Sequence, residues 1–299
     1  MEKQYKTAVV KVGTSTLTHN TGMLNIRKIE HLCKVLCDIE NSGVRIVLVS
    51  SGAVSAGWVK MGLSKSPDTI SGKQAAAAIG QCELMSLYSR YMRDYGYTVA
   101  QVLLTKDVVE VPLQKENAEN TFGTLLEGRS IPIVNENDTV SYEGIKIGGN
   151  DILAAYVACL VKADLLINLS DVDGFYTGNP ATDPDARLIP VVEKITKEIE
   201  NLAGGAGTAR GTGGMRAKLE AAKIAGGAGI PMVIANGKNP DILYEILKGT
   251  AMGTLFLPAG AYADEDRILR IRPSCKGHCG RTFEKGAFPP RRDLRPCQK

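Results

Sequence analysis

Two lysines lie in separate glycine-containing segments that could bind an anion. Lys11 stands near the end of an apolar run, and Gly13 and several hydroxyl-bearing residues follow it directly. Lys218 comes after the run Thr212-Gly213-Gly214-Met215, which we expect to enter a helix. Glycine lets a backbone approach an anion closely, helix N-termini attract negative charge, and an ammonium neutralises phosphate oxygens. Either segment alone could be an ordinary connection, so the prediction of a phosphate site depends on their combination.

A second set of polar segments could bind an amino acid. Ser51-Gly52 follows an apolar run, Asn135-Glu136-Asn137-Asp138 follows another, and Asn150-Asp151 stands where a helix is expected to open. Hydroxyls can donate to a carboxylate, whereas amide and acid oxygens suit an ammonium group. A helix N-cap would explain Ser51 or Asn150 equally well. It does not explain the whole cluster at 135–138, so a functional role is favoured there.

Ser170-Asp171 begins an acidic loop after a further apolar run. Such a loop could bind a hydrated metal or the hydroxyls of a nucleoside. The sequence Asp171-Val172-Asp173-Gly174 is also an ordinary turn, so this segment is weak evidence when it is taken alone.

Short runs rich in Val, Ile and Leu alternate with stretches of helical periodicity. Strands are predicted near residues 7–12, 44–49, 97–104, 131–135, 164–169 and 231–235, with 253–256 as the last segment of the sheet, and helices near 25–41, 73–94, 113–127, 150–162, 193–202, 215–227 and 239–248. This alternation is typical of an α/β fold in which helices cover a mostly parallel sheet. Loops at the carboxyl ends of such strands form the ligand crevice, so we expect the polar segments to meet there.

Positive charge is concentrated at the end of the chain. The 299 residues carry a net charge of +4, but residues 264–299 alone hold ten Lys or Arg against five Asp or Glu. Pro, Arg and Cys accumulate in this region without apolar periodicity. We therefore expect a folded domain at residues 1–261 and a basic, disordered tail at residues 262–299.

The composition also indicates a compartment. The N-terminal residues lack the apolar core of a signal peptide, and no apolar run is long enough to span a bilayer. The chain has seven cysteines, an odd number that argues for reduced thiols. We therefore expect a cytoplasmic protein without a membrane partner.

Several common catalytic motifs are absent from the sequence. There is no G-x-x-x-x-G-K-[ST] of a P-loop and no G-x-G-x-x-G of a dinucleotide-binding fold. The histidines are limited to His19, His31 and His278, which form no plausible catalytic triad or zinc site in the body of the chain. Phosphoryl transfer fits the remaining groups because it needs positioning and charge neutralisation more than a nucleophile or a tuned base.

Taken in order, these segments resemble the amino acid kinase family over roughly residues 5–257. The resemblance is carried by Lys11-x-Gly13, Ser51-Gly52-Ala53, Asn135-Glu136-Asn137-Asp138, Asn150-Asp151, Ser170-Asp171, Gly174-x-Tyr176-Thr177 and Gly211-Thr212-Gly213-Gly214-Met215-x-x-Lys218. The ordered set is far more specific than any one loop. It implies a three-layer sandwich and, most closely, the branch that uses ATP and Mg²⁺ to phosphorylate the γ-carboxylate of L-glutamate at the start of proline biosynthesis.

The resemblance also implies roles for individual residues. Lys11 and Lys218 correspond to the lysines that hold the transferring phosphoryl group, and Asp151 would orient them. Substrate binding is implied for Ser51, Gly52, Asn135, Asp138 and Asn150, and ATP binding for Lys11, Gly13, Ser170, Asp171, Thr212, Gly213, Gly214, Met215 and Lys218. No protein ligand to a metal is implied.

The expected partners follow from the same family. A labile acyl phosphate suggests hand-over to a reducing dehydrogenase, glutamate-5-semialdehyde dehydrogenase, and we expect a homo-oligomer.

Two features of this sequence depart from other members of the family. Gly149 stands where relatives often carry Asp, and residues 262–299 do not resemble the C-terminal PUA domain, an RNA-binding-like fold, of many bacterial relatives.

Three alternatives stay open at this point. A relative acting on N-acetylglutamate is the nearest rival within the fold, although the acidic 135–138 segment favours a free ammonium. RNA binding through the basic tail is disfavoured because the tail lacks interleaved aromatics. A zinc site at Cys275, His278, Cys279 and Cys297 has irregular spacing, which makes chance the better explanation.

Overall fold

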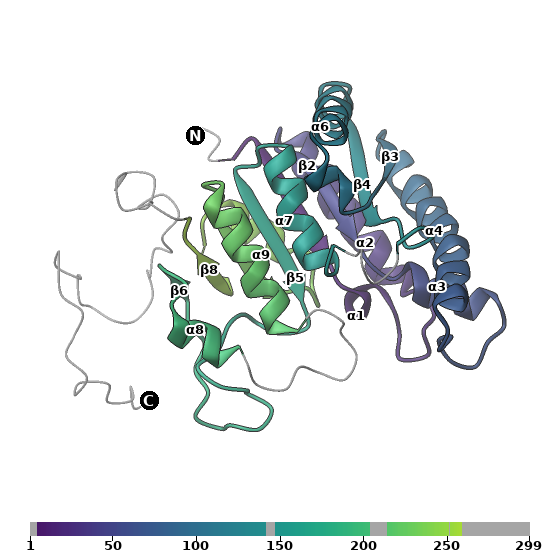
Figure 1. The fold of residues 1–299 in the computed structure, drawn as a ribbon. Helices are drawn as coiled ribbons and strands as arrows, with labels where there is room; N and C mark the ends of the chain where they lie inside the picture. Colours follow the sequence, from purple (N-terminus) through teal and green to yellow (C-terminus); the bar gives the residue numbers. More distant parts are fainter. Residues whose placement is uncertain (1–4, 142–146, 204–213, 251, 259–299) are drawn as a thin grey trace, which may run out of the picture.

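A central eight-stranded sheet organises the computed structural model, which describes residues 5–141, 147–203, 214–250 and 252–258. The strands lie in the order β3-β4-β2-β1-β5-β7-β8-β6 (Figure 1). Their bounds are β1 Thr7–Val12, β2 Arg45–Ser50, β3 Thr98–Leu104, β4 Ser130–Glu136, β5 Leu165–Ser170, β6 Val191–Val192, β7 Met232–Asn236 and β8 Thr254–Phe256. The tail expected at 262–299 lies outside the described residues, as do Gly211, Thr212 and Gly213.

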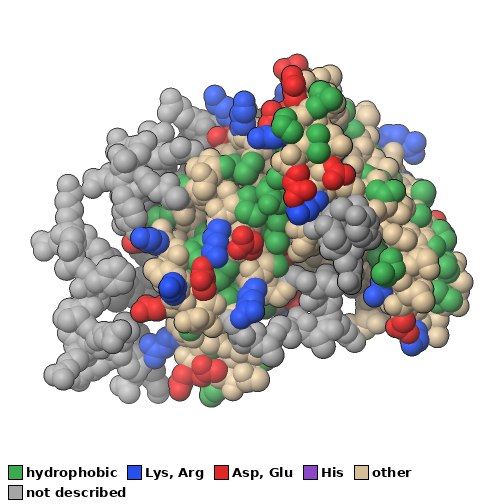
Figure 2. Space-filling model, in the orientation of Figure 1, with side chains coloured by type: hydrophobic (Ala, Val, Ile, Leu, Met, Phe, Trp, Pro, Cys, Tyr) green, Lys and Arg blue, Asp and Glu red, His purple; other side chains and the backbone are tan. Residues whose placement is uncertain are grey.

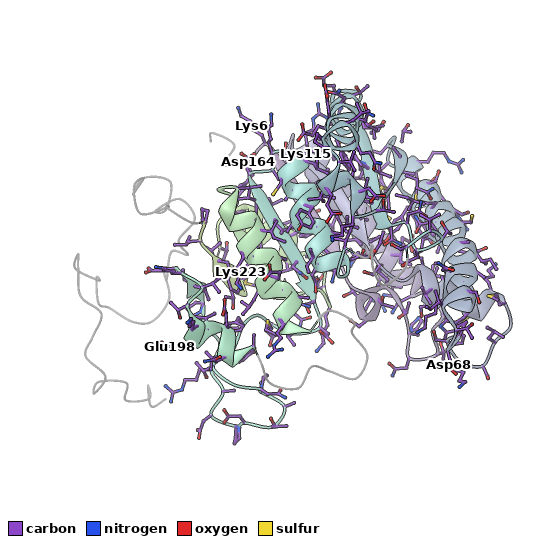
Figure 3. The ribbon with its side chains drawn as sticks, viewed as in Figure 1. Lys6, Asp68, Lys115, Asp164, Glu198 and Lys223 are labelled. Carbon is purple, nitrogen blue, oxygen red and sulfur yellow. The ribbon has the colours of Figure 1, made fainter. Side chains whose placement is uncertain are left out.

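β1 lies at the centre of the sheet, parallel to β2 on one side and to β5 on the other. Only β8 and its neighbour β6 run against the rest, since β8 pairs antiparallel with β7 and parallel with β6. At the amino end of β1, the backbone N–H groups of Lys6 and Thr7 donate to Asp164 Oδ2 (Figure 3). The carboxyl ends of the parallel strands lie at the opposite edge of the sheet. The strand order reverses at β1, and open α/β sheets bind ligands at such a point, outside the carboxyl ends of the strands.

Helices cover both faces of the sheet. α2 Ile26–Asn41, α4 Ile70–Arg93 and α10 Ile242–Leu247 pack on one face, and α6 Pro112–Glu127, α7 Asn150–Leu160 and α9 Met215–Gly227 on the other (Figure 1). Alternate strand residues supply the two cores, because successive side chains of a strand point to opposite faces. Val10 packs with the first set and Val9 with the second. The predicted three-layer α/β sandwich is confirmed.

The structure also has elements that the sequence did not predict. These are the short helices α1 Thr14–Leu17 and α5 Asp107–Glu110, the strand β6, and the helix α3 Ala53–Lys60. The helix expected at 193–202 is shorter and is α8 Lys197–Leu202. None of the described helices is both long and apolar enough to cross a membrane.

Helices α3 and α4 pack with their backbones in direct contact. A Cβ atom added at Gly57 of α3 would fall on the carbonyl oxygen of Ala76, and one added at Gly80 of α4 would fall on that of Ala53. Only glycine permits this approach. Gly57, which stands in a segment that looks like a loop in the sequence, and Gly80, which stands in a predicted helix, therefore let this helix pair pack closely.

We expect Gly57→Ala and Gly80→Ala each to lower the free energy of unfolding by about 1–3 kcal/mol or more, because a methyl group must push the two helices apart. The matched control is Gly123→Ala on α6, where an added Cβ meets nothing within 4 Å. That change should stabilise the protein by about 0.5–1 kcal/mol. Urea unfolding measures all three, and equal effects at the three sites would contradict the close packing of α3 on α4.

Candidate active site

The carboxyl ends of β1, β2, β4 and β5 open on a cavity of about 940 Å³. Helices α3, α7 and α9 begin at its wall, each directly after a glycine: Gly52, Gly149 and Gly214. The first turn of a helix has unpaired N–H groups and the positive end of the helix dipole. Three helix N-termini at one cavity therefore favour an anionic ligand.

Asp151 joins the two lysines that the sequence singled out. Lys11 Nζ lies 2.6 Å from Asp151 Oδ1, and Lys218 Nζ lies 3.1 Å from Oδ2. The three side chains come from β1, α7 and α9 and are almost completely buried. Asn168 of β5, the register partner of Lys11, donates from Nδ2 to the same Oδ1 at 2.8 Å. The fold thus brings together, around one carboxylate, residues up to 207 positions apart.

The buried charges of Lys11, Asp151 and Lys218 shift the pKa values of Asp151 and Lys11. Burial favours the neutral form of Asp151, but the positive charges of Lys11 and Lys218 and the hydrogen bonds from Lys11 and Asn168 outweigh burial and lower the pKa of Asp151. For Lys11, burial is the largest effect and lowers the pKa, the neighbouring Lys218 lowers it further, and Asp151 opposes both. Asp151 brings one negative charge to the two ammonium groups that it contacts, and Asp171 has a smaller opposing effect on the pKa of Lys11. A bound anion would complete the balance.

Asn150 connects the remaining polar segments. Its Nδ2 lies 2.9 Å from Ser51 Oγ, 2.9 Å from Asn135 Oδ1 and 3.0 Å from the Ser50 carbonyl oxygen. Gly52, Asn135, Asp138 and Asn150 line the cavity, and Ser51 reaches it through Asn150. The residues expected at the substrate site therefore do converge.

The polar cluster at 135–138 divides between two roles. Glu136 is buried, and its Oε1 accepts from Ser141 Oγ at 2.9 Å and from the Ile147 backbone N–H at 3.1 Å. These bonds hold the two sides of the loop that follows β4. Asp138 is half-buried and lines the cavity. Glu136 therefore shapes the wall, while Asp138 is placed to meet a ligand.

Most of the residues expected to bind nucleotide also line the cavity. Lys11, Gly13, Ser170, Asp171, Gly214, Met215 and Lys218 are all among the lining residues, whereas Thr212 and Gly213 lie outside the described part of the chain. Ser170 Oγ donates to Asp171 Oδ1 at 3.2 Å. Phe175 and Tyr176 are lining residues too.

Gly149 has a structural explanation. Its φ of 99° lies in the left-handed region, which is rarely adopted by residues with a Cβ. An added Cβ would meet nothing within 4 Å, so backbone conformation rather than space selects glycine there. The preceding Gly148 has a φ of 100°. This pair turns the chain into the first turn of α7, where Asn150 and Asp151 stand.

Several lining residues were missed by sequence analysis. Trp58, the only tryptophan in the chain, lines the cavity from α3, and Lys73 and Gln74 line it from α4. Asn168 was missed because it lies within an apolar strand. A polar residue in such a run was the available signal, since a buried amide needs a partner.

Comparison with known proteins places these features in a family. The sequence profile described as "Amino acid kinase family" matches residues 6–236. The chain is 53% identical over 259 residues to a glutamate 5-kinase from Clostridium perfringens (strain 13 / Type A), covering 85% of this chain and 96% of that protein. A glutamate 5-kinase from Listeria innocua is 52% identical over 258 residues, covering 85% and 94%.

Solved structures share the fold at low sequence identity. A UMP kinase from Bacillus anthracis has a TM-score of 0.60 at 14% identity, covering 86% of this chain and 97% of that one. An isopentenyl phosphate kinase from T. acidophilum has a TM-score of 0.57 at 18% identity, covering 84% and 99%. At these identities the likeness concerns the fold alone.

We expect Asp151→Asn to lower the free energy of unfolding at pH 7 by about 3–5 kcal/mol, because it leaves two buried ammonium groups without their counter-charge. The pKa of Asp151 is lowered in the folded protein. Its ionised form therefore stabilises the fold above the ordinary pKa of a free aspartate, and this contribution is lost as the pH falls through the lowered value. In urea unfolding, the gap between the two proteins should stay constant from about pH 7 to pH 5 and shrink below about pH 4.

The control is Asp68→Asn, which removes an exposed carboxylate paired with Lys65 (Figure 3). Exposed pairs contribute little, so we expect no measurable change in unfolding. An Asp151→Asn protein as stable as the unmodified one at pH 7 would show that the two lysines do not depend on this carboxylate.

Proposed function

The chain belongs to the amino acid kinase family, and we infer that it transfers the γ-phosphoryl group of ATP to the side-chain carboxylate of L-glutamate. The products are an acyl phosphate, glutamyl 5-phosphate, and ADP, which makes the chain a phosphotransferase of amino-acid biosynthesis that acts at the first step of proline synthesis. The observation that carries this proposal is the pairing of Lys11 and Lys218 with Asp151 at a cavity surrounded by helix N-termini. The sequence relatives, which are glutamate 5-kinases, support the choice of acceptor.

In the proposed reaction a γ-carboxylate oxygen of glutamate attacks the γ-phosphorus of ATP. A new O–P bond forms as the bond between the γ-phosphorus and the bridging oxygen breaks, and ADP leaves with that bond's electron pair. The attacking carboxylate is already ionised at neutral pH, so no general base is needed. Lys11 and Lys218 would neutralise the charge that develops on the transferring group. Asp151 touches no substrate in this scheme; it holds the two ammonium groups in place.

We propose that the half of the cavity near β4 and α7 binds glutamate. Asp138 would pair with the substrate α-ammonium, and Ser51, Gly52, Asn135 and Asn150 would form the rest of this subsite. A free ammonium gains from a carboxylate, whereas an acetylated nitrogen does not. Asp138 therefore favours glutamate over N-acetylglutamate as the substrate.

We propose that the other half binds ATP through Gly13, Ser170, Asp171, Gly214 and Met215, together with the two lysines and with Thr212 and Gly213. Among the described residues no group of three or more His, Cys, Asp or Glu side chains could hold a metal. Mg²⁺ usually binds through one or two carboxylates plus substrate phosphates, and Asp171 is an exposed carboxylate at the cavity that could contribute. When bound with ATP, Mg²⁺ would neutralise phosphate charge.

Further proposals concern the setting of the enzyme. We propose a cytoplasmic homo-oligomer whose labile product passes to a glutamate-5-semialdehyde dehydrogenase, with residues 1–261 as the catalytic unit and residues 262–299 dispensable for the reaction. On the face shown in Figure 2, Lys and Arg side chains are interspersed with Asp and Glu among the described residues, so this face lacks the continuous basic patch that nucleic-acid binding needs.

We expect Lys218→Ala and Lys11→Ala each to lower kcat by roughly a hundredfold to a thousandfold, the usual cost of removing one preorganised electrostatic donor. The control is Lys223→Ala on the same helix as Lys218 (Figure 3). Lys223 makes an exposed ion pair with Glu200 at 2.7 Å, so its loss should leave kcat unchanged. ADP release from ATP and Mg²⁺ at saturating glutamate measures all three, and near-normal kcat in a folded lysine variant would remove that lysine from the mechanism.

We expect Asp138→Asn to raise KM for glutamate roughly tenfold or more while KM for ATP changes little, because a charge-assisted hydrogen bond to the substrate ammonium is lost. Steady-state kinetics with each substrate varied in turn provides the measurement. The same assay with N-acetylglutamate tests the substrate itself. If the unmodified enzyme prefers N-acetylglutamate, both the role of Asp138 and the proposed substrate are wrong.

A further inference from the structure

A chain of side-chain amides runs from the cavity into the protein. Asn150 Nδ2 donates to Asn135 Oδ1 at 2.9 Å, Asn135 Nδ2 donates to Gln81 Oε1 at 3.1 Å, and Gln81 Nε2 donates to Gln101 Oε1 at 3.2 Å. The four residues come from α7, β4, α4 and β3. Helices α4 and α7 cover opposite faces of the sheet. This row of hydrogen-bonded amides therefore connects the two helical layers around the carboxyl end of β4.

Backbone groups fix the direction of this chain. The Glu136 N–H can only donate, and it donates to Asn135 Oδ1 at 2.9 Å. The Ser50 carbonyl can only accept, and it accepts from Asn150 Nδ2 at 3.0 Å. The orientation of both asparagine amides thus follows from their partners. Asn135 Nδ2 must then find an acceptor on the side of α4, and Gln81 supplies it.

Gln81 is buried, with 9% of its surface exposed, and it is not among the residues that line the cavity. Asn135 is 4% exposed. Without Gln81 Oε1, a buried amide N–H of Asn135 loses its acceptor, which is costly enough to make the side chain rearrange. Asn135 Oδ1 would then no longer be held against Asn150. At the other end, Gln101 is exposed, so water can replace its contact.

This arrangement has a consequence for the ligand. Three acceptors lie within hydrogen-bond distance of Asn150 Nδ2 and can occupy both of its hydrogens, so its Oδ1 is the atom left to meet a donor in the cavity. A glutamate substrate brings such a donor in its α-ammonium. The rotamer of Asn150, and with it the position of this acceptor, depends on Asn135.

We propose that Gln81 is a positioning residue for glutamate: it holds Asn135, which holds Asn150 in the orientation that recognises the substrate. The inference rests on the proposed function and deepens it, because it assigns the amino acid subsite, but not the phosphoryl subsite, a support from helix α4. The ion pairs of Lys11 and Lys218 are made with Asp151, which is not a member of this row of amides. Loss of Gln81 should therefore act on glutamate binding and leave ATP binding unchanged.

The test compares Gln81→Met with Gln81→Glu. Methionine has similar length but offers no strong acceptor, so we expect KM for glutamate to rise roughly tenfold while KM for ATP stays within about twofold. A glutamate side chain at position 81 keeps an acceptor oxygen at the same distance along the side chain. In Gln81→Glu, KM for the substrate glutamate should therefore return to within about threefold of that of the unmodified enzyme. Fluorescence of Trp58, the only tryptophan and a lining residue, gives glutamate binding independently of turnover.

The matched control is Leu84→Ala, which alters a buried residue on the same helix. It should reduce stability in urea unfolding without changing KM for glutamate, and so separates positioning from general loosening of α4. If Gln81→Met does not fold, Gln81→Ala replaces it with the same expected rise in KM, since alanine favours the helix and also lacks the acceptor.

The outcomes distinguish this inference from the proposed function. An unmodified enzyme that releases no ADP with glutamate overturns both. An active unmodified enzyme with an unchanged KM for glutamate in Gln81→Met overturns only the role of Gln81. A parallel rise of both KM values in Gln81→Met and in Leu84→Ala also overturns it, because that pattern reports a structural role alone.

Discussion

Two buried ammonium groups that share one buried carboxylate are the constraint on which this structure depends. Lys11 and Lys218 could not be buried side by side without Asp151, since isolated charges are costly to remove from water. Even with it the group carries more positive than negative charge. Such an excess of positive charge suits the wall of a cavity that binds an anion. We propose that the transferring phosphoryl group offsets it.

The fold supplies each member of this group from a different element. β1, as the central strand, brings Lys11 to the point where the strand order reverses, and α7 and α9 begin beside it. Asp151 stands in the first turn of α7, where a carboxylate is stabilised by the helix dipole as well as by the lysines. Gly148 and Gly149, with their left-handed backbones, let α7 start at that place. A local glycine conformation thus decides where the buried charge lies.

The sequence predicted the strands and long helices well because apolar periodicity reports burial directly. It also predicted that the polar segments would meet, because loops at the carboxyl ends of parallel strands share one edge. It did not predict α3, since the glycines and serines of 52–57 look like a loop; the requirement for Gly57 arises only from the backbone of α4. Gln81 and Asn168 were missed for a related reason. Their roles come from partners distant in the chain, and no local pattern marks a partner.

The two halves of the cavity are built by different physical means. The part around Asp151, where we propose that the phosphoryl group binds, uses formal charge, held by short ion pairs on elements of the central sheet and of one helical layer. The part where we propose that glutamate binds combines the carboxylate of Asp138 with neutral amides whose direction is set by backbone groups, and it includes α3 and α4, which are packed through glycine. Charge acts over several ångströms and tolerates small displacements, whereas hydrogen bonds fail with small errors of angle. On our proposal, discrimination among acceptor substrates therefore depends on Asp138 and on how rigidly α4 is held against β4, while phosphoryl transfer depends on the charges of Lys11, Asp151 and Lys218.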